Sequence, residues 1–126
     1  MATPVYHAQS SVNKWGGTLD DYLPIHNWFD YTKAFHPDFR HRALRHHSLG
    51  IQECMNEFGD YIEISTGKKV PVKLIAEQHV IEDCGKIPSV SEWLINLTPL
   101  EWMSKARNLS KIYDKNNERP TPKVVG

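Results

Sequence analysis

With 126 residues, the chain has room for one domain with a single modest hydrophobic core. Fifteen basic residues balance fifteen acidic ones, which argues against a broadly basic nucleic-acid-binding protein, although a local basic patch stays open. The chain is 40% hydrophobic and 24% charged, as in soluble globular proteins, and no window approaches the roughly 18 apolar residues of a membrane-spanning helix. Cys54 and Cys84 form no CxxC pair, and we expect reduced thiols in a cytoplasmic protein.

The first part of the chain predicts an extended segment and then a helix. Residues 1–17 are expected to form an extended lead-in. Thr18, followed three residues later by Asp21, is typical of a helix start. Pro24 also suits the first position of a helix, so the helix starts either after Thr18 or at Pro24. In the second case it covers residues 25–35. Its buried stripe is predicted to consist of Ile25, Trp28, Phe29 and Thr32.

The middle of the chain predicts one long helix and one β-hairpin. Pro37 is expected to begin the longest helix, residues 37–58, and Gly59 to end it. Residues 61–73 then alternate in polarity around a turn at residues 66–67, which is typical of a short hairpin.

The last part of the chain predicts a further helix and two short helix starts. Residues 74–84 form a helix that Gly85 ends, and capping boxes begin at Ser89 and Thr98. The predicted fold is mainly α within the α+β class, a compact helical domain with one short β-hairpin. We expect a single globular domain over residues 1–110 and a flexible C-terminal tail over residues 111–126.

Histidines and arginines gather in residues 36–50, which contain four of the seven histidines and three arginines. On an ideal helix, His46 and His47 diverge by about 100°, so this helix cannot form a metal site by itself. His47 points toward the apolar stripe of this helix, His46 points elsewhere, and His41 lies at the opposite edge of the stripe. The stripe is predicted to consist of Leu44, Ile51, Met55 and Phe58.

Two other segments supply further ligands. His26 and Asp30 are four residues apart on one helix, and His79, Glu82 and Asp83 share one face of another. Imidazoles and carboxylates from helices that pack together would suit Zn, Mn or Fe. The predicted metal ligands are His26, His46, His47, His79 and Asp83.

Each of these patterns has a plainer interpretation. A helical face with His, Glu and Asp is commonly only solvated, and an inward His47 is commonly a hydrogen-bonded core residue. His7 and His36 are expected to be surface or capping residues. Three arginines offer donors for phosphate oxygens, yet a surface charge cluster without a ligand explains them equally well. The predicted anion-binding residues are Arg40, Arg42 and Arg45.

Two resemblances follow from these segments. Residues 26–47 and 77–88 together resemble a family of small uncharacterised proteins of bacteria and their phages, a domain of unknown function, which implies no particular activity. The run His79-Val-Ile-Glu-Asp83-Cys-Gly85-Lys-Ile87-Pro88 is similar to a motif of HD-domain phosphohydrolases. That similarity implies divalent metal and phosphoester cleavage, but Glu82-Asp83 replaces the adjacent His-Asp pair of the motif.

These observations support two functions. The first is a metal-dependent hydrolase of a phosphoester or nucleotide, in which a metal lowers the pKa of a bound water and Glu82 or Glu77 acts as general base. The second is a non-catalytic phage or prophage protein that binds a phosphate-bearing small molecule or a host protein. The expected location is the bacterial cytoplasm, or the host cytoplasm if a phage encodes the chain.

Overall fold

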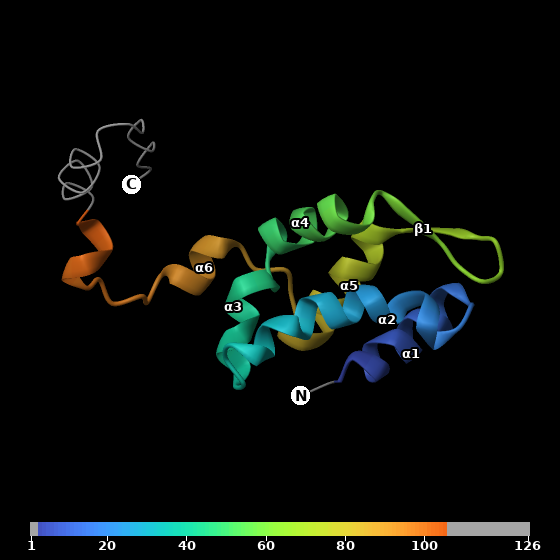
Figure 1. Ribbon diagram of the computed structural model, residues 1–126, viewed down its shortest axis with the longest axis horizontal. Coiled ribbons are helices and arrows are strands. Elements are labelled where there is room, and N and C mark those ends of the chain that lie inside the picture. The colour runs from blue at the N-terminus through green and yellow to red at the C-terminus, as the bar shows by residue number, and fades with distance from the viewer. Residues whose placement is uncertain (1–2, 106–126) are drawn as a thin grey trace, which may run out of the picture. The chain divides into compact units, whose positions relative to one another are not determined.

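The computed structural model describes residues 3–105 and divides the chain into two compact units, residues 1–95 and 96–126, which are treated separately below. Within the described residues of the first unit, α-helices pack together and one hairpin projects at the end of the unit (Figure 1). Its helices and strands are α1 (Pro4–Trp15), α2 (Leu19–Asp30), η1 (Tyr31–Ala34), η2 (Phe39–His41), α3 (Arg42–Arg45), α4 (Ser48–Phe58), β1 (Tyr61–Glu63), β2 (Lys69–Pro71), α5 (Val72–Cys84) and α6 (Val90–Leu94). The mainly α fold with one antiparallel hairpin is as predicted. The predicted tail at residues 111–126 lies outside the described residues.

Helix α1 corrects the prediction of an extended lead-in over residues 1–17. Thr3 caps the helix by accepting the Tyr6 N–H at 3.3 Å, and Pro4 occupies its first position. The buried face consists of His7, Ala8 and Ser11 and is therefore largely polar. A polar buried face gives no apolar periodicity, which is why the helix could not be recognised from hydrophobic spacing.

Helix α2 begins at the capping box that the sequence predicts. The Thr18 N–H donates to Asp21 Oδ2 at 2.8 Å, and Pro24 lies inside the helix instead of at its start. After Asp30 the chain continues as the short 3₁₀ helix η1 up to Ala34. The predicted stripe is confirmed, since Ile25, Phe29 and Thr32 are buried and Trp28 packs against the core.

The single helix predicted over residues 37–58 is wrong, because the chain breaks at His46 and His47. His46 adopts φ −86° and ψ 66°, and His47 is extended, with φ −162° and ψ 175°. The break separates α3 from α4 and turns His46 into the interior, where it is fully buried. It also moves Leu44 out of the expected stripe, leaving it 50% exposed, whereas Ile51 stays buried. Gly59 ends α4 as predicted.

The hairpin and the helix after it follow the prediction closely. Tyr61 pairs with Pro71, Ile62 with Val70 and Glu63 with Lys69. Helix α5 begins at Val72, directly after β2, and Gly85 ends it in the left-handed conformation, with φ 78°.

The two predicted capping boxes near the C-terminus have different outcomes. Ser89 and Glu92 form the predicted box at the start of α6, with the Glu92 N–H donating to Ser89 Oγ at 3.2 Å. Thr98 starts no helix. In the second unit, the short 3₁₀ helix η3 (Glu101–Ser104) begins after Leu100 instead.

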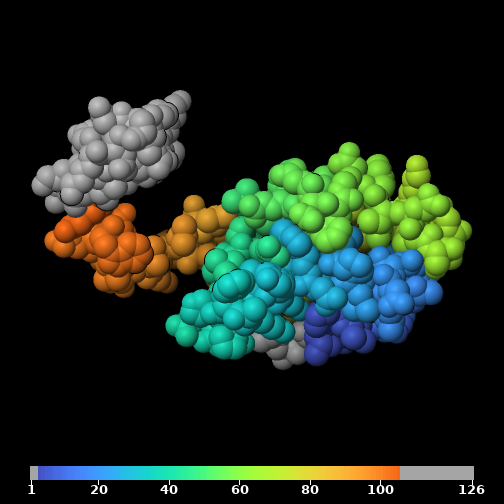
Figure 2. All heavy atoms as spheres, viewed as in Figure 1, coloured from blue at the N-terminus to red at the C-terminus, as the bar shows by residue number. Residues whose placement is uncertain are grey.

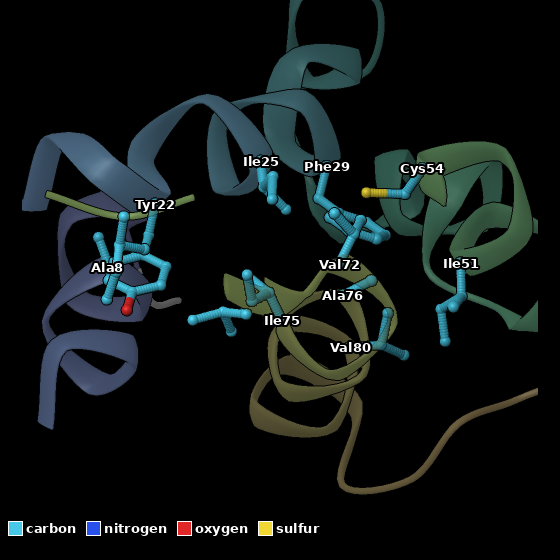
Figure 3. Close-up of a cluster of buried hydrophobic side chains, with 12 residues drawn as sticks. Ala8, Tyr22, Ile25, Phe29, Ile51, Cys54, Val72, Ile75, Ala76 and Val80 are labelled. Atoms are coloured by element: carbon cyan, nitrogen blue, oxygen red, sulfur yellow. The ribbon is translucent and has the colours of Figure 1, made fainter. Parts of the chain in front are cut away.

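The core lies where α2, α4 and α5 face one another, with α1 packed against α2 and α5 (Figures 1 and 3). In the view of Figure 2, the side chains of α2 lie between those of α1 and α4. Phe29, Cys54 and Ala76 meet in the centre, and burial raises the pKa of the Cys54 thiol to about 12, as suits an inert packed cysteine. In the second unit, Trp102 is 70% exposed. Among the described residues, no helix has the length and apolarity that crossing a membrane requires.

Gly50 is the residue that permits the break before α4. A Cβ added at Gly50 would lie 1.8 Å from the carbonyl oxygen of Arg45, because the chain folds back on itself at residues 46–47. We expect Gly50→Ala to lower the free energy of unfolding by about 3 kcal/mol, measured by urea denaturation. Gln52→Ala, on the exposed side of the same helix, is the control and should change it little. Equal stability of the two variants would contradict this account of the break.

Candidate metal centre

Six of the seven histidines are buried, and only His36 is exposed. They come from α1, α2, η2, the break before α4, and α5, so the fold gathers them from across the first unit. The buried histidines are His7, His26, His41, His46, His47 and His79. Two aspartates, Asp30 and Asp83, have side chains only 5% and 2% exposed and lie among them. Polar groups buried at this density must satisfy one another or bind a ligand.

Four side chains direct one donor atom each toward a common point. Asp30, His46, His79 and Asp83 place these atoms within 4.8 Å of one another. Asp83 Oδ2 lies 2.9 Å from His46 Nε2 and 3.2 Å from His79 Nε2. Asp30 Oδ1 lies 3.3 Å from His79 Nε2 and 3.8 Å from His46 Nε2. The four donor atoms therefore come from three places in the fold: the end of α2, the break before α4, and the C-terminal half of α5.

These separations match those between the ligands of one metal ion. Donors about 2.1 Å from an ion lie about 3.0 Å apart at an angle of 90° and about 3.4 Å apart at the tetrahedral angle. The four measured distances, 2.9 to 3.8 Å, span this range. The buried Asp/His group could therefore hold a metal, with a mixed nitrogen and oxygen set of the kind that binds Zn, Mn or Fe.

A chain of hydrogen bonds through Gln78, Ser11 and His26 determines where the protons lie on the side of His79 that faces away from the four-donor group. The Gln78 amide nitrogen donates to the His7 carbonyl and to Glu82 Oε1, both at 2.9 Å. Both partners can only accept, so the other amide atom, Oε1, is the acceptor of this side chain. Ser11 Oγ lies 2.7 Å from that Oε1 and 3.1 Å from the His7 carbonyl oxygen, and since both can only accept, its only proton is committed to these two atoms.

The same chain then determines the tautomer of His79. Because the Ser11 proton is committed, His26 Nε2, at 2.8 Å from Ser11 Oγ, must donate to Ser11. Burial, together with the nearby His79 and His7, lowers the pKa of His26 to about 2, so its Nδ1 carries no proton at neutral pH. His79 Nδ1, at 2.9 Å from that atom, therefore donates.

This tautomer leaves the Nε2 of His79 free to coordinate a metal ion. With its proton on Nδ1, a neutral His79 directs the Nε2 lone pair at Asp83 Oδ2 and Asp30 Oδ1, at 3.2 and 3.3 Å. A lone pair facing two carboxylates is repulsive unless a cation lies among them, either a metal ion or a second proton on the ring. Metal-binding histidines commonly donate their other ring N–H in this way.

The outer oxygen of Asp83 is held by cations. His7 Nε2 lies 3.1 Å from Asp83 Oδ1, and His7 Nδ1 lies 2.8 Å from Glu82 Oε1. Burial works to lower the pKa of His7, but these contacts with two carboxylates outweigh it and raise that pKa. Arg42 also lies 3.7 Å from Asp83 Oδ1 and donates to its carbonyl. Burial opposes ionisation of Asp83, yet the neighbouring His46, His7 and His79 rings hold its pKa far below the usual range.

His46 and His47 have different roles although they are adjacent. Burial lowers the pKa of His46 to about 4, so it is neutral at pH 7 and able to coordinate. His47 caps α4, its Nδ1 accepting the Gly50 N–H at 2.9 Å. The structure therefore places His46 in the four-donor group and His47 at a helix end.

The remaining predicted site residues lie apart from the four-donor group. His26 contacts it only through His79. Glu82 receives hydrogen bonds from Ser10 and Gln78 as well as contacting His7. Glu77 lines a different cavity, with Lys73 among its neighbours.

The three arginines also have separate environments. Arg40 is exposed and paired with Asp38 at 2.8 Å, and Arg45 stacks over the Trp28 ring at 3.9 Å. Arg42 alone reaches Asp83.

A surface cleft opens beside the donor group. It has a volume of about 420 Å³ and contains two cationic side chains, Arg42 and Lys86, together with Asp83. Trp93 forms part of its wall and is fixed there because its indole N–H donates to the His46 carbonyl at 2.8 Å. Its full lining is Arg42, Asp83, Cys84, Lys86, Pro88, Glu92 and Trp93.

The predicted set of site residues left out three important residues, Asp30, His7 and His41. Asp30 was visible as the i, i+4 partner of His26, but its second partner, His79, is distant in sequence. His7 was expected at the surface, yet it is fully buried against Asp83. His41 lies 3.7 Å from Asp30 and was placed at the wrong edge of a helix that the chain does not form.

The proton assignment on His79 can be measured directly. We expect long-range ¹H–¹⁵N correlation spectra at neutral pH to show a protonated Nδ1 on His79. Ser11→Ala would leave Gln78 Oε1 and His26 Nε2 without their partner, so it should lower the free energy of unfolding by about 1–3 kcal/mol. Ser48→Ala, at an exposed helix start, is the control. A His79 Nδ1 without a proton in the unmodified chain would contradict the hydrogen-bond chain.

Comparison with known proteins places the chain in a family. Residues 2–103 match the family model described as Domain of unknown function (DUF6915). Searches of the curated proteins and of the solved structures found no match. The match covers the four-donor group, the cleft and the hydrogen-bond chain described above. The chain therefore belongs to this domain-of-unknown-function family, DUF6915.

Proposed function

We propose that this protein is a metal-dependent hydrolase of a phosphoester or nucleotide, acting in the cytoplasm of a bacterium or of a phage-infected host. One observation carries the proposal: Asp83 belongs both to the four-donor group and to the lining of the cleft, which also contains Arg42 and Lys86. A metal held there would lie directly beneath a space that suits a phosphate. The similarity of residues 79–88 to the motif of HD-domain phosphohydrolases agrees with this proposal.

The chemistry requires a nucleophile and a place for negative charge. A metal held by Asp30, His46, His79 and Asp83 would lower the pKa of a bound water toward 7 and polarise a phosphoryl oxygen. In the hydrolysis, a P–O bond to the water oxygen forms, the P–O bond to the leaving group breaks, and the water proton ends on the leaving oxygen. Arg42 would bind the phosphoryl oxygens, since it lines the cleft beside Asp83 and carries a positive charge.

Other residues of the site have supporting roles in this proposal. Glu82 holds His7, and His7 holds the outer oxygen of Asp83, so the two fix the direction of the inner oxygen. Glu82 thus positions Asp83 through His7, and a metal-activated water needs no strong general base. Lys86 and Trp93 line the cleft, where they suit a phosphate and an aromatic group of the substrate.

A second candidate function uses the same cleft without turnover. The donor atoms are almost completely buried, since His46 and His79 are 0% exposed. A metal could therefore serve only to fasten α2 to α5, while the cleft binds a phosphate-bearing molecule or a host protein. Metal content with binding of phosphoesters, but no release of product, would favour this phage or prophage binding function.

The hydrolase proposal is tested first by metal content and turnover. Purified full-length protein should contain about one Zn, Mn or Fe per chain by elemental analysis and should cleave members of a generic phosphoester panel. Chelation should abolish cleavage, and adding back the metal should restore it. Asp83→Asn should lower metal affinity by about tenfold or more, because it removes a ligand charge, whereas exposed Asp60→Asn should not. Metal-free protein that gains no stability from added Zn, Mn or Fe would overturn the proposal.

The cleft is tested by a residue that has no part in the metal group. Lys86 is 64% exposed and pairs only with Glu92 among the described residues, so Lys86→Gln should fold normally. We expect it to raise the KM for the phosphoester several-fold with bound metal unchanged, because the cleft loses one positive charge. Lys69→Gln, in the hairpin, is the charge-matched control. Equal KM values for the two variants would exclude this cleft as the substrate site.

A further inference from the structure

His41 is a buried histidine whose Nε2 has no partner. The ring is 0% exposed and lies at the end of η2. Its Nδ1 lies 2.7 Å from the carbonyl oxygen of Asp38, and a carbonyl oxygen can only accept, so Nδ1 carries the proton. In the neutral ring, Nε2 is then a bare lone pair. This Nε2 is buried and has no hydrogen bond within the described residues.

The bare nitrogen faces a carboxylate that is also short of partners. His41 Nε2 lies 3.7 Å from Asp30 Oδ1, and the other oxygen of Asp30, Oδ2, is buried without a hydrogen bond. The nearest cation to Oδ2 is Lys33 Nζ, 4.0 Å away. Two acceptor atoms that face each other inside a protein are costly to bury unless a cation satisfies both.

We propose that His41 is a fifth ligand of the metal in the four-donor group. This inference rests on the metal of the proposed function, but not on hydrolysis. The Asp30 oxygen that faces His41 is the one that faces His79 and His46, so an ion bound to this oxygen would lie beside the His41 ring. His41 Nε2 is not among the donor atoms that lie within 4.8 Å of one another, so it would close on the ion as the ion binds. The His41 and His46 rings are 5.6 Å apart and nearly perpendicular, at 87°, as rings that approach one point from two directions.

The broken helix is explained by this ligand set. Residues five apart on a continuous α-helix point about 140° away from each other, so His41 and His46 could not share an ion on the predicted helix. The short α3 and the non-helical His46 bring both imidazoles to Asp30. The Asp38 carbonyl sets the tautomer that a ligand needs.

A set of three imidazoles and two carboxylates has consequences for the metal. Five protein donors exceed the four of tetrahedral zinc sites and leave one open position on a six-coordinate ion. The centre is therefore of the kind that Mn²⁺ or Fe²⁺ occupies, with the last position open to one water.

Cobalt(II) titration of the full chain tests the coordination number without any activity assay. Five- or six-coordinate Co²⁺ absorbs weakly in the visible range, and tetrahedral Co²⁺ absorbs strongly, so we expect weak bands from the unmodified protein. His41→Gln should lower Co²⁺ affinity by about tenfold or more and intensify the bands as the coordination number falls. His36→Gln, the exposed histidine of the same segment, should leave both unchanged.

The outcomes separate this inference from the proposed function. Strong tetrahedral bands in the unmodified protein would overturn the fifth ligand while leaving a four-donor centre and the hydrolase in place. Unchanged affinity and spectrum in a folded His41→Gln would do the same. If His41→Gln does not fold, the paramagnetic shifts of the His41 ring protons in the Co²⁺-bound unmodified protein decide the question: strongly shifted signals support the fifth ligand, and unshifted signals overturn it. No Co²⁺ binding by the unmodified protein would overturn the inference together with the metal centre.

Discussion

The structure depends on one electrostatic constraint: two carboxylates and several imidazoles share a small buried volume. Asp30 and Asp83 direct oxygens at the same place, and His79 directs a lone pair there as well. Groups of this kind repel one another in a medium of low polarity unless a cation lies between them. The protein fixes the outer protons through Ser11 and His26, and a cation at the centre, either a metal ion or a proton, would relieve this repulsion.

The backbone is arranged around that constraint more than around apolar burial. Helix α1 turns a polar face inward because His7 must reach Asp83 and Ser11 must reach His26. The chain gives up helical hydrogen bonding at His46 and His47, and the Trp93 indole takes up the freed His46 carbonyl. Such departures from regular structure cost stability, and proteins keep them mainly at functional sites.

The sequence allowed most of the regular structure to be predicted, and the reasons for the misses are physical. Capping residues at Thr18 and Ser89, glycines 59 and 85, and the alternation of the hairpin act locally, so they could be recognised from neighbouring residues. Helix α1 was missed because its buried face is polar.

The candidate site was predictable only in part. His79 and Asp83 share a helical face, so their spacing identified them, and His46 was named without its orientation. Asp30, His41 and His7 acquire their roles from contacts between residues far apart in the chain. A helical-wheel projection that assumed one continuous helix gave the wrong orientations for His41 and His46.

The position of Asp83 bears on whether the centre is structural or catalytic. A metal that served only to fasten helices would be best enclosed by ligands that none of the surface reaches. Asp83 belongs to the four-donor group and also lines an open cleft with Arg42 and Lys86, although its side chain is only 2% exposed. His7 contacts the outer oxygen of the same aspartate and so restrains its direction. If a metal binds there, a substrate in the cleft would approach it beside Asp83, which the proposed hydrolysis requires and a purely structural centre does not.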